Sequence, residues 1–131
     1  MGEKKSLEVR DISVWNEGKT ELENWKPHPS EIYSRIELWI GYKNSSAHEL
    51  FYFYLVTPDG LAKNLEISDH IFLSEHTMII GVYDSQRFLE RIHEILRKCT
   101  RPAWEDSALA LSKFFHWEYA DMEPLGDRVM N

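Results

Sequence analysis

The segment Glu49-Leu-Phe-Tyr-Phe-Tyr-Leu-Val-Thr57 decides the fold. Seven consecutive apolar or aromatic residues follow Glu49, and neither glycine nor proline interrupts them. Aromatic side chains favour strands, and the run is too short for a free-standing helix. We therefore predict a strand with Phe51, Phe53 and Leu55 on one face and Leu50, Tyr52, Tyr54 and Val56 on the other. Because only one face is wholly apolar, the strand is expected in the middle of a sheet with helices on that side.

The preceding segment, 31–42, alternates between two kinds of side chain, which is a strong strand signal. One face carries Ile32, Ser34, Ile36, Leu38 and Ile40, and the other carries Tyr33, Arg35, Glu37 and Trp39. The polar turn 43–46 is long enough for a hairpin but too short for a crossover. The two strands are therefore predicted to pair antiparallel.

The other elements follow from periodicity and capping signals. A strand with a bulge near Asp11 is expected at 7–14, and a loop at 16–29 from which Trp25 folds back onto the core edge. Thr57 is predicted to cap a short helix over 59–65. Further elements are a strand at 77–83, a long helix capped by Asp84 or Ser85 with an apolar stripe ending at Cys99, a third helix carrying Trp104, Ala108, Leu111 and Phe115 on one face, and a last strand at 115–119.

This order, β-β-β-α-β-α-α-β, predicts an α+β fold. We expect an antiparallel or mixed sheet of four to five strands with two to three helices packed on one face. The size of 131 residues fits one domain over 1–131, with loose termini at 1–6 and 123–131.

Charge and composition narrow the class of partner. With 22 acidic against 15 basic residues the net charge is −7, which disfavours direct binding to nucleic acid or to an anionic membrane. No stretch reaches the ~18 apolar residues of a membrane span. The single cysteine cannot form an internal disulfide, which fits a reducing cytoplasm. We expect a soluble cytoplasmic protein, either a monomer or a homodimer.

Catalytic and metal-binding patterns are weak. The six histidines include no pair at the i, i+4 spacing that places two imidazoles on one ion, so no metal or cofactor is predicted. His70, Glu75 and His76 are the nearest approach to a cluster, and an enzyme built on them would need the three groups to converge. Cys99 falls on an apolar helix stripe, where a small buried hydrophobe is expected. The sequence therefore predicts no enzyme.

Surface recognition remains as the candidate function. Tyr33, Glu37, Trp39, Tyr52 and Tyr54 should share the sheet face away from the helices, with Tyr83 extending it from the next strand. Tryptophan, tyrosine and arginine dominate binding hot spots. The sequence leaves open whether the Trp25 loop or the C-terminal tail covers this face. A second candidate surface is acidic and includes Glu118 and Asp121. The simpler interpretation of this surface is a solvated tail.

Several short motifs, taken in order, resemble the immunity-protein-eight family of bacterial polymorphic toxin systems. They are Phe53-x-x-x-Thr57-Pro58-x-x-Leu61, Met78-Ile79-Ile80-x-x-Tyr83-Asp84, Trp104-Glu105-x-x-Ala108-x-x-Leu111 and Trp117-Glu118-Tyr119-x-Asp121. Leu22-x-x-Trp25-x-Pro27 and Gly41 are compatible with it, and the resemblance covers roughly 7–122. Met122 and the polar turn 43–46 depart from the family pattern and put the partner surface in question more than the fold.

The resemblance implies an α+β cytoplasmic protein without catalysis that binds and neutralises a cognate protein toxin. The family is associated with more than one toxin type. Where the toxin is a nuclease, carboxylates of an immunity protein can occupy the phosphate positions of a basic groove. The alternative is a small-ligand-binding or regulatory module that uses the tyrosine- and tryptophan-rich sheet face.

Overall fold

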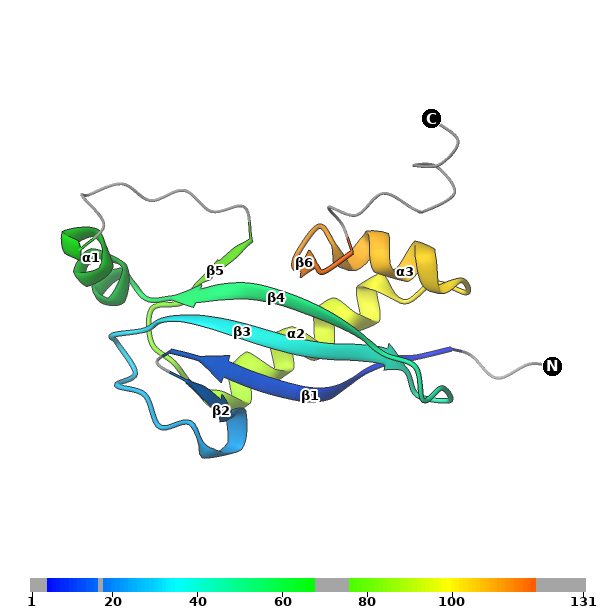
Figure 1. Cartoon of the computed structure of the whole chain (residues 1–131), viewed down its shortest axis with the longest axis horizontal. Helices are drawn as coiled ribbons and strands as arrows, with labels where there is room; N and C mark the ends of the chain where they lie inside the picture. Colours follow the sequence, from blue (N-terminus) through cyan, green and yellow to red (C-terminus); the bar gives the residue numbers. More distant parts are fainter. Residues whose placement is uncertain (1–4, 17, 68–75, 120–131) are drawn as a thin grey trace.

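The computed structural model describes residues 5–16, 18–67 and 76–119, and in these it forms one sheet flanked by helices (Figure 1). The strands are β1 (Leu7–Trp15), β2 (Lys19–Glu21), β3 (Tyr33–Tyr42), β4 (Glu49–Val56), β5 (Thr77–Ile79) and β6 (His116–Trp117). The helices are the 3-10 turn η1 (Leu22–Asn24), α1 (Pro58–Ile67), α2 (Ser85–Cys99) and α3 (Trp104–Leu111).

The strands run in the order β2-β1-β3-β4-β5, and β6 also pairs with β4. All pairs are antiparallel except the short parallel pair of β4 with β5, so the sheet is mixed. The predicted α+β class and the β3–β4 hairpin are confirmed. The predicted bulge in β1 is present as a register shift between Val9 and Asp11.

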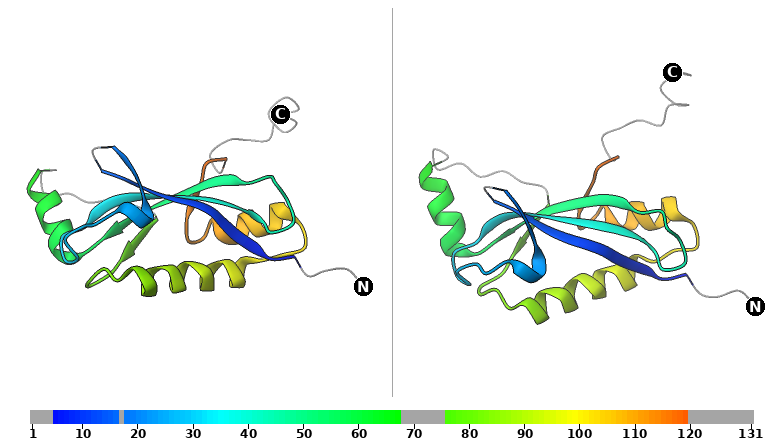
Figure 2. Two further views of the ribbon diagram at one scale, coloured as in Figure 1. Left: turned by 90° about the horizontal axis from the view of Figure 1, so that it is seen from below. Right: turned by 60° about the horizontal axis from the view of Figure 1, so that its bottom comes forward.

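The core lies between the sheet and two helices, α2 and α3, which cover the same sheet face (Figure 2). Leu38 pairs with Phe51 and Ile36 with Phe53, and all four side chains are at most 1% exposed. The apolar stripe of α2 buries Phe88, Ile92, Ile95, Leu96 and Cys99 against them. Full burial of each large apolar side chain contributes roughly 1.5–3 kcal/mol, so this layer supplies most of the driving force for folding.

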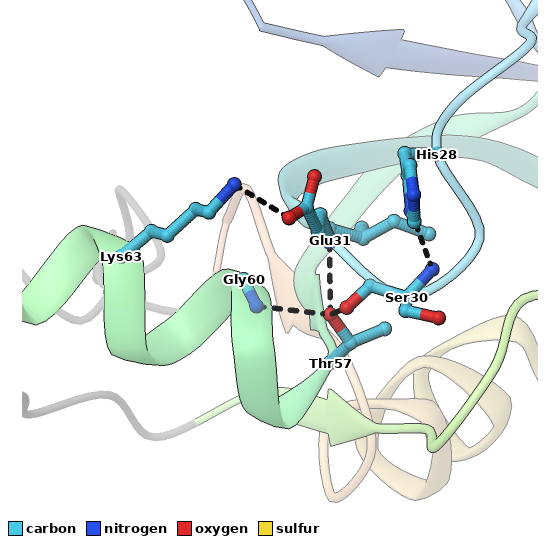
Figure 3. Close-up of polar contacts among 7 residues, drawn as sticks. His28, Ser30, Glu31, Thr57, Gly60 and Lys63 are labelled. Carbon is cyan, nitrogen blue, oxygen red and sulfur yellow. Dashed lines mark hydrogen bonds and ion pairs between the residues drawn. The ribbon is translucent and has the colours of Figure 1, made fainter.

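The α1 helix lies at one end of the sheet (Figure 1) and is anchored by Thr57, as predicted (Figure 3). The Thr57 Oγ1 atom accepts hydrogen bonds from the backbone N–H of Gly60 at 3.1 Å and of Ile32 at 2.9 Å, and it donates to the Ser30 carbonyl at 2.6 Å. A Cβ atom on Gly60 would lie 2.0 Å from the Ile32 carbonyl oxygen. Only glycine therefore lets the first turn of α1 approach β3 this closely.

The segment predicted as a loop at 16–29 contains β2 and η1, so the sheet formed by the described residues has six strands rather than four or five. These elements are too short to show a period in the sequence. Trp25, which follows them, is 9% exposed and joins the core, as expected.

The strand predicted at 77–83 is shorter than expected and ends at Ile79. The chain leaves the sheet because the Tyr83 N–H donates to the Pro29 carbonyl at 2.9 Å, and because its ring packs on Trp25 and Phe88. The third helix ends at Leu111, although Phe115 still reaches the core at 1% exposure. The predicted last strand at 115–119 is reduced to His116–Trp117. The predicted tail at 123–131 lies outside the described residues.

Candidate partner-binding face

The sheet face away from α2 and α3 carries five of the predicted site residues. We define the open face as the outward side chains of β3 and β4, namely Tyr33, Arg35, Glu37, Trp39, Leu50, Tyr52 and Tyr54. Cross-strand pairing places Arg35 opposite Tyr54, Glu37 opposite Tyr52 and Trp39 opposite Leu50. Residues paired in this way are direct neighbours on one face. All seven side chains are half-buried, so the face is accessible in part.

Arg35 lies at the centre of the open face. Its Nη2 atom pairs with the Glu37 Oε2 atom at 3.0 Å, and its Cζ atom lies 3.8 Å from the centre of the Tyr52 ring. This stacking fixes the plane of the guanidinium. The Arg35 Nε atom is buried and has no hydrogen-bond partner among the described residues. The face thus presents an oriented cation beside an aromatic ring.

Two further aromatic contacts extend the face in both directions. The rings of Tyr33 and Tyr54 lie 5.8 Å apart, and burial together with Tyr54 raises the pKa of Tyr33. The Tyr33 hydroxyl therefore keeps its proton at neutral pH and can donate a hydrogen bond. At the other end, Trp39 meets the His48 ring edge-on at 5.3 Å.

Strand β6 adds residues that sequence reasoning did not select. His116 pairs with Tyr52 in register, and their rings lie 4.6 Å apart. The His116 ring lies 5.7 Å from that of His76, whose Nε2 atom is 2.9 Å from the Ser112 carbonyl oxygen. A two-residue strand has no readable period, so only the neighbouring Phe115 and Trp117, both directed at the core, could have indicated that His116 points outward.

Strand β1 also reaches this side of the sheet. Trp15, which is 40% exposed, pairs with Arg35, and Ser13 pairs with Glu37. The sequence missed this row because the bulge after Val9 changes which residues of β1 point outward. Once the bulge is placed, the alternate spacing of Asp11, Ser13 and Trp15 indicates that these three residues lie on the same side of the sheet as the open face.

Tyr83 does not extend the open face, contrary to the prediction. Its ring lies 4.9 Å from that of Trp25 and 5.8 Å from that of Phe88, on the helix side of the sheet. Burial, with a smaller effect of Asp84, raises the pKa of Tyr83. The prediction failed because it assumed a strand continuing to residue 83. The Trp25 ring, considered as a cover for the open face, belongs to the core instead.

The acidic residues predicted near the C-terminus are only partly described. The Glu118 N–H donates to the Leu50 carbonyl at 3.0 Å, which places Glu118 directly after β6, and its side chain is half-buried. Asp121 lies outside the described residues. Its role stays a prediction.

The candidate catalytic groups do not form a constellation in the described part of the chain. Cys99 is 2% exposed, and burial raises the pKa of its thiol, which opposes the reactive thiolate form. His70 and Glu75 lie outside the described residues. Among those that are described, no three His, Cys, Asp or Glu side chains are grouped to hold a metal ion.

None of the described helices combines the length and apolar character needed to cross a membrane.

Comparison with known families gives one match. The sequence model of the family described as Immunity protein 8 matches residues 7–122. This range includes every described strand and helix. Comparisons with curated proteins and with solved structures gave no match.

Proposed function

The chain belongs to the immunity protein 8 family, and from this membership we propose that it is a non-catalytic protein that binds and neutralises a cognate bacterial toxin in the cytoplasm. The family match over 7–122 is the observation that carries the proposal, because it spans every strand and α-helix that the structure describes. The protein would act by stoichiometric binding.

The open face supports this proposal and is its candidate contact surface. Arginine, tyrosine and tryptophan make the largest contributions at protein interfaces because they bury much area and keep a polar group. Arg35 is already oriented by Glu37 and Tyr52, so little side-chain entropy is lost when a partner docks. We assign the toxin contact to Tyr33, Glu37, Trp39, Tyr52 and Tyr54, with Glu118 and Asp121 as flanking acids.

The net charge of −7 favours a basic toxin surface. A nuclease fits this requirement because its substrate groove is basic, and carboxylates can take the positions of phosphates. Association should then be fast and should slow as salt is added, because screening weakens the long-range attraction. A salt-insensitive association rate would argue for a toxin of another chemistry.

Co-expression with the cognate toxin, sought among the neighbouring genes, tests the function directly. We expect cells that produce the toxin to survive only when this protein is present, and the two proteins to co-purify. Continued killing in the presence of folded protein, confirmed by circular dichroism, would count against the proposal. Stabilisation by a metabolite, without any protein partner in pull-downs, would favour the ligand-binding alternative.

A single substitution tests the open face. Trp39→Ala removes a large half-buried ring and should weaken toxin binding at least tenfold, or about 1.4 kcal/mol, as measured by calorimetry. Leu109→Ala is the matched control, because Leu109 is 59% exposed and lies on α3, at the covered face of the sheet. Equal affinities of the two variants would remove the open face as the contact surface.

A further inference from the structure

A groove of about 720 Å³ runs along the outer edge of β1, beyond the point where β2 ends. The chain after β2 turns towards the N-terminal half of α2 (Figures 1 and 2), and residues of both segments line the groove. The groove is lined by residues of β1, of η1 with the segment after it, and of α2, including Val9, Ile12, Leu22, Trp25, Leu89 and His93.

The edge of β1 in this groove has no partner strand among the described residues. Strand β2 pairs only with Ser13, Val14 and Trp15, so β1 from Leu7 to Ile12 is paired on the β3 side alone. An unpaired edge can accept an extended peptide through backbone hydrogen bonds. Val9 and Ile12 are partly buried against the core and give the groove an apolar floor.

The charged residues that line the groove indicate the charge of the peptide it would bind. Asp11, Glu21 and Glu23 line it together with the bases Arg10 and Lys26. The Arg10 guanidinium is already occupied, because it pairs with Glu8 at 2.5 Å and donates to the carbonyls of Tyr42 and Ser45. Outside the lining, the Lys19 Nζ atom lies 3.9 Å from the Glu21 Oε1 atom. The three acids still outnumber the two lysines, Lys19 and Lys26, that remain to balance them.

Two of these acids lie close together, because Glu21 pairs in register with Ser13, which follows Asp11 by two residues and shares its strand face. A hydrogen bond with Asp11, followed by partial burial and by the negative charge of Asp11, raises the pKa of Glu21. Two carboxylates held this closely repel each other when both are ionised. A lysine or arginine placed between them would relieve that repulsion.

We propose that this groove binds an extended segment of a partner protein that carries lysine or arginine, with its backbone paired to the edge of β1 and its cation between Asp11 and Glu21. The surface adjoins the open face, since Asp11 pairs in register with Trp39. The inference rests on the proposed function only for the identity of the partner, because the groove requires a basic segment and not a toxin as such.

A pair of synthetic peptides tests the groove on the full chain. One is a capped heptapeptide that alternates lysine and valine, and the other has glutamate in place of lysine. Binding is followed by calorimetry, and its position by the NMR shifts of the Trp25 indole N–H and the Leu89 amide. The double variant Asp11→Asn, Glu21→Gln removes the two carboxylates. The variant Glu66→Gln, Glu90→Gln removes the same charge at exposed positions outside the groove.

We expect the basic peptide to bind, to shift both groove signals and to lose at least tenfold in affinity on the Asp11, Glu21 variant, with a change of about twofold or less on the control. No binding of the basic peptide, equal binding of the acidic one, or equal losses on both variants would overturn the proposal. Neither peptide involves a toxin, so failure of the groove is distinguishable from failure of the proposed function.

Discussion

The two faces of the β3–β4 hairpin are built from alternate residues of the same two strands, yet they differ in chemistry. Towards α2 and α3, Ile36, Leu38, Phe51 and Phe53 are at most 1% exposed. Away from the helices, the open face has half-buried tyrosines, a tryptophan and an ion pair. The period of two thus separates side chains that are packed in the core from side chains that stay in partial contact with solvent.

The largest effect should come from exchanging a side chain on each face at adjacent positions. Phe53→Ala opens a cavity among Ile36, Phe88 and Phe115 and should cost about 3–5 kcal/mol in the free energy of unfolding. Tyr54→Ala should cost only about 1–2 kcal/mol, because its ring is half-buried and loses one aromatic contact with Tyr33. Urea unfolding measures both. Similar costs would show that the open face is also part of the core.

Polar groups sharpen the same contrast. Thr57 is fully buried and its hydroxyl makes three hydrogen bonds, so Thr57→Val leaves the Ile32 and Gly60 N–H groups without partners and should cost about 2–4 kcal/mol. On the open face, Arg35→Met should change stability by about 1 kcal/mol or less, because the Arg35–Glu37 pair is only partly buried and ion pairs in contact with water contribute little.

Thr57→Ser is the control for the first of these variants, since it keeps the hydroxyl and should restore most of the stability in thermal melts. If Thr57→Ser were as damaging as Thr57→Val, the methyl group and not the hydrogen bonds would be holding α1 in place.

The smallest effect concerns the carboxylate pair of Asp11 and Glu21. Because the pKa of Glu21 is raised above its ordinary value of 4.5, the native state holds this proton more tightly than the unfolded chain does. Its contribution to stability is therefore complete below pH 4.5 and is lost as the pH rises through the raised pKa. Glu21→Gln should melt slightly above the wild type at neutral pH, with the difference vanishing in acid. Glu66→Gln should show no such pH-dependent difference.

Much of the fold was predictable from residue patterns. The alternation at 31–42, the aromatic run of β4, the Thr57 cap and the stripe of α2 are all local signals, and each was confirmed. The signals failed where elements are very short. Strands β2, β5 and β6 have three, three and two residues, and their pairing depends on the edges of β1 and β4.

The candidate site divides in the same way. The alternation of β3 and β4 by itself determined that Tyr33, Glu37, Trp39, Tyr52 and Tyr54 share one face, because side-chain direction in a strand follows from backbone geometry. Only the tertiary structure decided that Tyr83 turns to the core, that His116 joins Tyr52, and that Asp11 lies near Glu21 at an edge of β1 without a partner strand among the described residues. Each of these contacts joins residues distant in sequence or separated by a bulge, and their meeting depends on how the whole chain packs.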